Sequence, residues 1–426
     1  MCGEFSEDAD VACGLSLCCS AMGWCGTTAV HCLNADPLHN TLPCQAGYGS
    51  CQIIDPPSCS PDGGSTGGRT VGYYQSWNVR DRKCNTVSPK QIKTEGFTHL
   101  FFAFATINPV TFKIAPAHPD DAALMREFTG LSKGGKLQTW IAIGGFDFSN
   151  EGTPTHTTWS DMCSTAANRA AFIKSVISFM DEYGFQGADL DWEYPAAPSR
   201  GGKRADTQNF VMLVKEMRAA FGTKYGISLP LAPDYWYLRG FNPSAMERYV
   251  DFFGFMAYDL HGPWDSDVGT LGSIVRGQAD IRDIERDTLP LWFDGLNPAK
   301  INFGLAMYGR GYTLSDPSCN RMLDCKFSGP SSPAACTNFG GVMSLSEVKR
   351  TIKEKGLTPR YNKDALMKEL TWDDQWIGYD DEETYAAKKR WANGQCFGGT
   401  MYWSVDFQLD DGAYYPNGTR RAVVAT

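Results

Sequence analysis

Short apolar runs alternate with amphipathic stretches over most of the chain after residue 69. In the stretches, apolar residues such as Phe172, Val176 and Met180 recur at helical spacing, which is typical of helices that pack on a sheet. The runs have the length and composition of buried strands, at 70–76, 98–105, 138–144, 186–193, 227–232, 251–257, 301–307 and 398–405. This alternation predicts eight βα units that close into a parallel α/β structure, a (β/α)8 TIM barrel.

A doubly wound open sheet is the alternative, but no glycine-rich nucleotide loop follows the first run. The long gap between the seventh and eighth runs predicts an α+β insertion at 313–372, followed by a last barrel helix at 382–392. We expect the barrel to span 69–412 and a tail to follow at 413–426.

The first 55 residues are rich in cysteine and poor in aliphatic residues. Six cysteines lie within residues 2–32, which are too few to form an ordinary core, so disulfides are expected to replace it. Spacing leaves the pairing open, and zinc is disfavoured because paired C-x-x-C units are missing. Cys44 and Cys51 predict a further disulfide loop, and 56–68 reads as a linker that Cys59 can tether.

Composition narrows the partners and the compartment. The net charge of −9, without a basic run, argues against nucleic acid, and no stretch of 18 apolar residues is present to span a membrane. Fifteen cysteines indicate an oxidising compartment, so we expect a secreted protein, in a mature form because the start lacks the features of a signal peptide. The 12 tryptophans and 18 tyrosines suit neutral ligands with flat faces, such as sugars. We expect a monomer without cofactor or metal.

Three acidic residues alternate with apolar ones in the fourth predicted strand. In a strand, Asp189, Asp191 and Glu193 point to one face, about 6 to 7 Å apart. Lining up three buried carboxylates costs free energy, since each loses its hydration beside like charges. A solvated acidic face is the alternative, but the apolar flanks argue against it. The pattern therefore predicts acid–base catalysis at the carboxyl ends of the barrel strands.

Five motifs in order resemble glycoside hydrolase family 18, the chitinases, over residues 70 to 410. They are Asp189-Leu190-Asp191-Trp192-Glu193-Tyr194-Pro195, Gly144-Gly145, Met256-Ala257-Tyr258-Asp259, Tyr308-Gly309-Arg310 and Trp403. With the cysteine-rich start, the chain is most similar to fungal chitinases related to killer-toxin subunits. The resemblance implies an endo-type chitinase acting on chitin and chitin oligosaccharides with retention of configuration, in which the acetamido oxygen of the sugar replaces a second carboxylate.

The resemblance also implies a role for individual residues. Glu193 is the general acid, Asp191 orients the acetamido group, Asp189 shares a proton with Asp191, and Tyr258 holds the acetamido oxygen. The expected substrate contacts are Asp259, Trp403, Met256, Tyr73, Gly144, Gly145, Arg310, Trp77, Trp264 and Trp372. The alternative for Tyr258 and Trp403 is a place in the barrel core.

Two positions depart from the family pattern. Gln186-Gly187 stands where the acid motif often opens with Asp-Gly, which should affect packing more than catalysis. Ala142 stands where many members have a serine that helps to hold the innermost acid, which leaves Tyr73 as the remaining partner of Asp189. We therefore expect altered proton sharing at Asp189.

The run from Cys18 to Gly26 resembles the hevein-like chitin-binding module over residues 2 to about 33. That family stacks sugars on three aromatic side chains and binds the acetamido group through a serine. Ser20 and Trp24 match, while Met22 and His31 stand at the other two aromatic positions and offer weaker surfaces. A purely structural module is the alternative.

Three rival functions fit the same barrel. A chitin-binding lectin is disfavoured by Glu193, which lectins of this type usually lack. A toxin subunit that docks on chitin is the second, and Cys59, Cys84, Cys163 or Cys396 is available for a bond to its partner, since the odd total leaves a cysteine unpaired. A hydrolase of N-glycan cores is the third, which the chitin-binding start disfavours.

Overall fold

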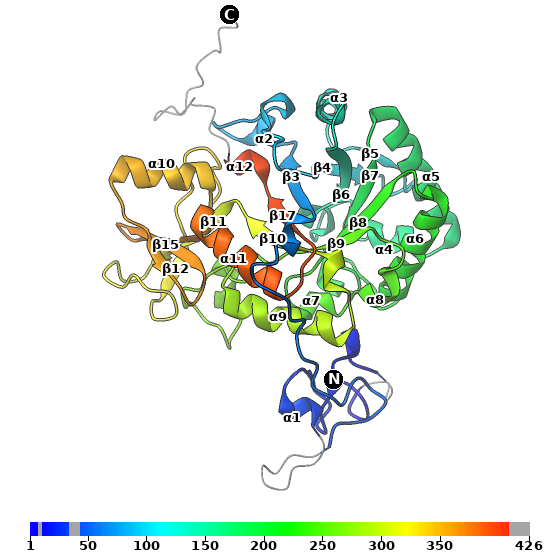
Figure 1. Cartoon of the computed structure of the whole chain (residues 1–426), viewed down its shortest axis with the longest axis horizontal. Coiled ribbons are helices and arrows are strands. Elements are labelled where there is room, and N and C mark those ends of the chain that lie inside the picture. Colours follow the sequence, from blue (N-terminus) through cyan, green and yellow to red (C-terminus); the bar gives the residue numbers. More distant parts are fainter. Residues whose placement is uncertain (7–10, 34–42, 409–426) are drawn as a thin grey trace, which may run out of the picture.

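The computed structural model describes residues 1–6, 11–33 and 43–408, and the tail expected at 413–426 lies outside them. Its centre is a closed barrel of eight parallel strands (Figure 1). In order around the barrel they are β3 (Thr70–Gln75), β4 (His99–Ile107), β6 (Gln138–Gly144), β7 (Gly187–Asp191), β8 (Gly226–Leu231), β9 (Phe252–Phe255), β10 (Ile301–Ala306) and β17 (Gly399–Trp403). Each predicted run overlaps one of these strands, so the predicted TIM barrel is confirmed.

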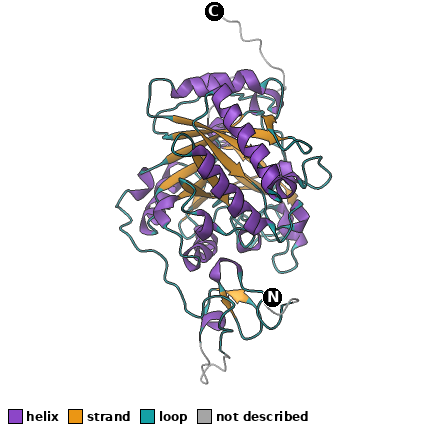
Figure 2. Cartoon of the chain, turned by 90° about the vertical axis from the view of Figure 1, so that its right-hand side faces the viewer, coloured by secondary structure: helices purple, strands orange, loops and turns teal. Residues whose placement is uncertain are grey.

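Helices surround the barrel, as Figure 2 shows. The longer ones are α3 (Asp121–Thr129), α4 (Thr158–Cys163), α5 (Ala166–Tyr183), α6 (Asp206–Phe221), α9 (Ile281–Phe293) and α11 (Glu382–Gly394). Short helices α2 (Asn78–Asp81), α7 (Tyr235–Leu238) and α8 (Pro243–Met246) lie in the connections, and α12 (Val405–Gln408) follows the last strand. The strand β5 (Ile114–Pro116) pairs antiparallel with β4. None of the helices in the described part of the chain has the length and apolar character to cross a bilayer.

Aromatic rings fill the amino-terminal end of the barrel. Trp140 stacks on Phe101 and Phe252, with centroid distances of 5.3 and 5.2 Å. Gly187 and Gly226 face the indole so closely that a Cβ at either position would lie within 2.4 Å of it. The Gln186-Gly187 pair is therefore part of this packing, because only glycine leaves room for Trp140.

The insertion is an antiparallel sheet with one helix, which stands beside the barrel in Figure 1. Its elements are β11 (Tyr308–Leu314), β12 (Phe327–Pro330), β13 (Val342–Ser344), α10 (Leu345–Lys355), β14 (Arg360–Asn362), β15 (Met367–Trp372) and β16 (Gln375–Tyr379). The predicted α+β insertion is confirmed, but its sheet begins at Tyr308, directly after β10, rather than at residue 313. The strand β11 pairs with three other strands of the sheet, β12, β13 and β16.

The cysteine-rich start folds as a small unit below the barrel in Figure 1. It contains β1 (Cys18–Cys19), β2 (Cys25–Gly26) and α1 (Ala29–Cys32). Its disulfides are Cys2–Cys19, Cys13–Cys25, Cys18–Cys32 and Cys44–Cys51. The unit contacts α7, where the Tyr235 hydroxyl donates a hydrogen bond of 3.3 Å to the carbonyl of Gly14. Disulfides therefore stand where a larger domain would have an apolar core.

The remaining disulfides connect distant segments. Cys59 of the linker bonds to Cys396, Cys84 bonds to Cys336 of the insertion, and Cys319 bonds to Cys325. The expectation that Cys59, Cys84 or Cys396 bonds to another chain is thus wrong. All fifteen cysteines lie among the described residues, and Cys163 is the one of them that is free; it is buried, so its thiol cannot reach a partner in the folded protein.

Candidate active site

The three acids lie at the carboxyl end of β7. The strand ends at Asp191 rather than at the predicted residue 193, and Glu193 begins the connection that follows. Asp189, Asp191 and Glu193 are 1%, 4% and 8% exposed. Burial removes hydration from all three carboxylates, which is the physical condition for perturbed pKa values.

Asp189 is held by two hydroxyl groups. Tyr73 of β3 donates to one carboxylate oxygen at 2.7 Å, and Ser228 of β8 donates to the other at 2.6 Å. Burial raises the pKa of Asp189 to about 6, while both hydrogen bonds oppose this shift. Tyr73 thus holds Asp189 as expected, but it is not the sole remaining partner, because Ser228 also donates to this acid. The sequence offered one sign of this role, because Ser228 is the single polar residue in the apolar run 227–232.

Asp191 is the acid whose pKa is raised by the charges of both other acids. Burial, and then the negative charges of Glu193 and Asp189, raise its pKa well above the ordinary value. Among the described residues, its buried Oδ1 has no hydrogen-bond partner. The arrangement keeps a proton on Asp191 and leaves one polar atom able to bind a ligand.

The Gly144-Gly145 pair brings the connection after β6 against this acid. Gly145 donates its N–H to the Asp191 carbonyl at 2.9 Å, and Gly144 lies so close that a Cβ would be 2.4 Å from the same oxygen. The φ angles of Gly144 and Gly145 are positive, at 99° and 87°, which other residues rarely adopt. The structure thus gives the pair a packing role, and its predicted contact with substrate stays a prediction.

Glu193 has a pKa that burial raises to about 7, against the lowering effects of the Tyr194 hydroxyl and the charge of Arg200. The Arg200 Nε also donates to the backbone carbonyl of Glu193 at 3.0 Å. Tyr194 stacks on Tyr237 of α7 with a centroid distance of 4.2 Å. Tyr194 belongs to the acid motif, whereas sequence reasoning missed Arg200, from the same connection, and Tyr237, which the fold brings in from the next connection.

Tyr258 lies among the acids, just beyond the end of β9. Burial raises its pKa well above the ordinary value, and the charges of Asp191, Asp259, Glu193 and Asp189 add to this shift. Its hydroxyl therefore stays protonated and able to donate. Met256, two residues earlier, is also buried. The structure brings Tyr258 to the acid series, as the motif predicts.

Asp259 is fixed by the insertion. Its Oδ1 accepts hydrogen bonds of 2.5 Å from the Tyr308 hydroxyl and from Arg310 Nε, both on β11. The Arg310 guanidinium in turn lies 4.7 Å from the ring of Trp264, which is partly exposed. Asp259 has a φ of 59°, a strained conformation that is concentrated at functional sites. Arg310 and Trp264 thus belong to one cluster around Asp259.

Trp403 is the last residue of β17 and lies over the barrel mouth with three other rings. Its indole is 5.3 Å from Tyr73, 5.7 Å from Phe104 and 6.3 Å from Trp77. These four rings form an apolar floor. The sequence analysis names three of them as substrate contacts and misses Phe104. Trp372 lies apart, in the β15–β16 hairpin, where its backbone pairs with Gln375.

The candidate binding residues of the N-terminal module differ in exposure. Trp24 and Met22 are 58% and 60% exposed, whereas Ser20 is buried and its Oγ accepts the Trp24 N–H at 3.1 Å. The His31 ring packs over Gly26 and pairs with the Thr28 hydroxyl at 2.8 Å. The module therefore presents Trp24 and Met22 to solvent and holds Ser20 beneath them.

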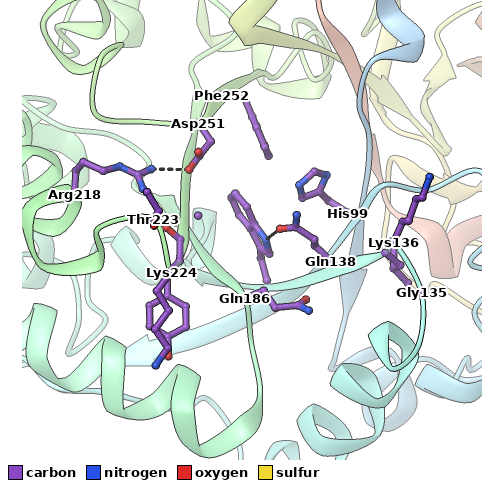
Figure 3. Close-up of a pocket in the computed structure, with 14 residues that line it drawn as sticks. His99, Gly135, Lys136, Gln138, Gln186, Arg218, Thr223, Lys224, Asp251 and Phe252 are labelled. Atoms are coloured by element: carbon purple, nitrogen blue, oxygen red, sulfur yellow. Dashed lines mark hydrogen bonds and ion pairs between the residues drawn. The ribbon is translucent and has the colours of Figure 1, made fainter.

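A cavity of about 570 Å³ lies at the opposite end of the barrel from the acids (Figure 3). It is lined by strand starts, including His99, Gln138 and Phe252, and by an ion pair between Arg218 and Asp251 of 2.6 Å. Burial lowers the pKa of His99 to about 4, so this imidazole is neutral. The acid series does not line this cavity, which separates it from the candidate active site.

Buried carboxylates at the carboxyl end of a (β/α)8 barrel, with an aromatic floor, define a glycoside hydrolase type of site. The chain belongs to the glycosyl hydrolases family 18, whose model matches residues 69–408. The secreted chitinase LysM12 of Penicillium expansum is 27% identical over 431 residues, which cover 95% of this chain and 28% of the relative.

Two further similarities bear on function. An oviduct-specific glycoprotein of Sus scrofa is 30% identical over 357 residues, which cover 80% of this chain and 64% of the relative. A variant of catalytic domain 2 of the Ostrinia furnacalis Group II chitinase, solved with (NAG)5, has a TM-score of 0.71 and 25% identity, covering 80% of this chain and 90% of that domain. The chain thus spans only part of each full-length relative.

Proposed function

We propose that this protein is a secreted, endo-type chitinase that hydrolyses the β-1,4 linkages of N-acetylglucosamine polymers with retention of configuration. The observation that carries the proposal is the buried series Asp189, Asp191 and Glu193, in which only the last acid lies beyond the strand end. Chitin oligosaccharides are its soluble substrates. The name of a Penicillium relative and the ligand of the Ostrinia domain support this choice.

Glu193 acts as the general acid. Its pKa of about 7 keeps the carboxyl protonated in a large fraction of molecules near neutral pH, so it can transfer a proton to the glycosidic oxygen. Once the leaving sugar has gone, the resulting carboxylate activates water. A pKa near the working pH suits both steps, because the same group must give and regain a proton.

The sugar supplies the nucleophile. A retaining enzyme with two carboxylates needs the second one ionised, but the raised pKa of Asp191 keeps that group protonated. The acetamido oxygen of the substrate attacks the anomeric carbon instead. Asp191 Oδ1, which is buried and unpartnered within the described part of the chain, accepts the acetamido N–H, and Tyr258 donates to the acetamido oxygen.

The other predicted residues hold the polymer. Trp403 and its neighbouring rings form the floor beneath the sugar, Asp259 contacts the sugar beside the cleaved bond, and the exposed Trp24 and Met22 of the hevein-like module bind the polymer elsewhere. A lectin is disfavoured because the acid at Glu193 is present. A toxin subunit bonded to a partner is disfavoured because Cys163, the one free cysteine, is buried.

Hydrolysis of a chitin oligosaccharide with resolved product anomers tests the proposal. We expect β products and a loss of activity of about a thousandfold in Glu193→Gln. Glu354→Gln, which changes an exposed carboxylate on α10, is the matched control and should behave like the wild type. Inverted products, or full activity in Glu193→Gln, would contradict the mechanism.

A further inference from the structure

The short helix α7 lies between the N-terminal module and the acid series. Tyr235, its first residue, donates a hydrogen bond of 3.3 Å from its hydroxyl to the carbonyl of Gly14 in the module. Two residues later, Tyr237 stacks at 4.2 Å on Tyr194, which directly follows Glu193 in the chain. One helical turn therefore contacts the module on one side and the neighbour of the proposed general acid on another.

Trp236 stands between these two contacts and faces solvent. Successive side chains of a helix are about 100° apart, so Trp236 points to neither of the sides that its two neighbours face. The module packs closely against Arg239, since a Cβ added to Gly14 would lie 3.1 Å from the Arg239 Cβ. Trp236 nevertheless stays 66% exposed. The contact between module and barrel thus leaves this indole free.

One face of the indole is covered by an arginine. The Arg239 guanidinium lies 4.2 Å from the centroid of the Trp236 ring, and its Nε donates to the Trp236 carbonyl at 3.1 Å. These contacts hold the ring in one orientation. A ring that is already oriented loses little side-chain freedom when a ligand binds to its open face.

Two other exposed rings near the acids share this arrangement. Phe146, after β6, is 54% exposed with the Arg200 guanidinium at 4.0 Å, and Trp264, after β9, is 43% exposed with Arg310 at 4.7 Å. Trp236 follows β8, and β7 with its acids lies between β6 and β8. Trp264 is an expected substrate contact. Trp236 repeats the same arrangement on the connection that contacts the module.

We propose that Trp236 binds one N-acetylglucosamine unit of chitin outside the cleft, at the junction of barrel and module. The inference rests on the proposed function, because the ligand is the same polymer. A sugar ring packs its C–H face on an indole and keeps its hydroxyl groups in water, which suits an exposed site. A protein partner would need a wider apolar surface, but Tyr235 and Tyr237 are already engaged. Trp236 therefore adds affinity for chains long enough to extend beyond the cleft.

The test measures binding in Glu193→Gln protein, in which hydrolysis is expected to be lost. Adding Trp236→Ala should weaken the binding of a six-sugar chitin oligosaccharide about tenfold in calorimetry and that of a three-sugar one little. Trp236→Phe, which keeps a ring, should retain most of the affinity. Tyr361→Ala is the matched control, because this ring also lies near a cation, Lys368 at 4.8 Å, but on the edge strand β14. It should bind both oligosaccharides like its parent.

Hydroxyl-radical footprinting of the Glu193→Gln protein is a second measurement that leaves Trp236 unchanged. The six-sugar chain should reduce oxidation of Trp236 but not of Tyr361. Unchanged affinity in Trp236→Ala, an unprotected Trp236, or equal losses for both chain lengths would overturn the inference, since equal losses would place the ring inside the cleft. If Trp236→Ala does not melt like its parent, the footprint decides. Absence of hydrolysis by the wild type, together with a length-dependent loss at Trp236, would contradict the proposed function alone.

Discussion

In the barrel, the residues assigned to chemistry are buried beside the strands that fix them, whereas in the N-terminal module the Trp24 and Met22 side chains assigned to sugar contact are exposed on a disulfide frame. Asp191 and Glu193 are 4% and 8% exposed, and Trp24 and Met22 are 58% and 60% exposed. Buried acids change one another's pKa values, because each charge alters the electric field at the next group. Exposed side chains act nearly independently, since water surrounds each of them.

The difference has an energetic side. Burial that shifts the pKa of an acid also costs folding free energy. In the barrel, the stabilisation from the large apolar core must offset this cost. The module has no such core, and its disulfides limit the unfolded chain instead. The two regions should therefore respond differently to the same kind of change.

The largest effect is expected from the buried acid that orients the substrate. Asp191→Asn should lower kcat on a soluble chitin oligosaccharide by about a hundredfold or more, because an amide cannot pass the shared proton to Asp189 as positive charge develops on the substrate. Steady-state kinetics would measure this. Asp324→Asn, at an exposed position, is the control. A loss confined to KM would show that Asp191 only binds the substrate.

The second effect concerns the disulfides. The combined Cys18→Ser and Cys32→Ser changes remove one bridge of the module, which should cost about 2–5 kcal/mol and unfold it. Retention on insoluble chitin should be lost, while hydrolysis of a short oligosaccharide is kept. The Cys319→Ser and Cys325→Ser pair, in the insertion, controls for loss of a disulfide as such. Equal losses of both activities would mean that the regions are not independent.

A smaller effect is expected from the exposed ring. Trp24→Ala should weaken binding to insoluble chitin about tenfold, and Met22→Ala should weaken it less, since a thioether has no rigid π surface. A pull-down with increasing amounts of chitin measures both. Val30→Ala, which also changes an exposed apolar side chain of the module, is the control. Unchanged binding in Trp24→Ala would favour the purely structural module.

The last prediction concerns the stability of the protein rather than its binding or its catalysis. Glu193 has a folded pKa of about 7, above the ordinary 4.5, so its protonated form is favoured by folding and stability is lost as pH rises from 4.5 through 7. Glu193→Gln cannot ionise. It should be more stable than the wild type by about 3 kcal/mol at pH 8 and equal to it at pH 4. Thermal melts at both pH values test this, and a variant less stable at pH 8 would contradict it.

Local pattern predicted much of this molecule. The eight strands and the acid series follow from periodicity and from motifs within a few residues, and both appear where the chain predicts them. Ser228 was missed although its position in an apolar run points inward, because its importance depends on register with Asp189 of the adjacent strand. The partners of Asp259 come from β11, which only the fold brings near. The pairing of the cysteines likewise depends on the fold, since Cys59 and Cys396 are 337 positions apart in the sequence.

The bond between Cys59 and Cys396 has a consequence for survival among proteases. It encloses nearly the whole barrel and insertion in one covalent ring, with the linker at one side and the connection before β17 at the other. A single cut in any surface loop between these cysteines opens the ring but releases no fragment. The two pieces stay joined and packed, so a nicked molecule can keep its shape until a reductant reaches the bond.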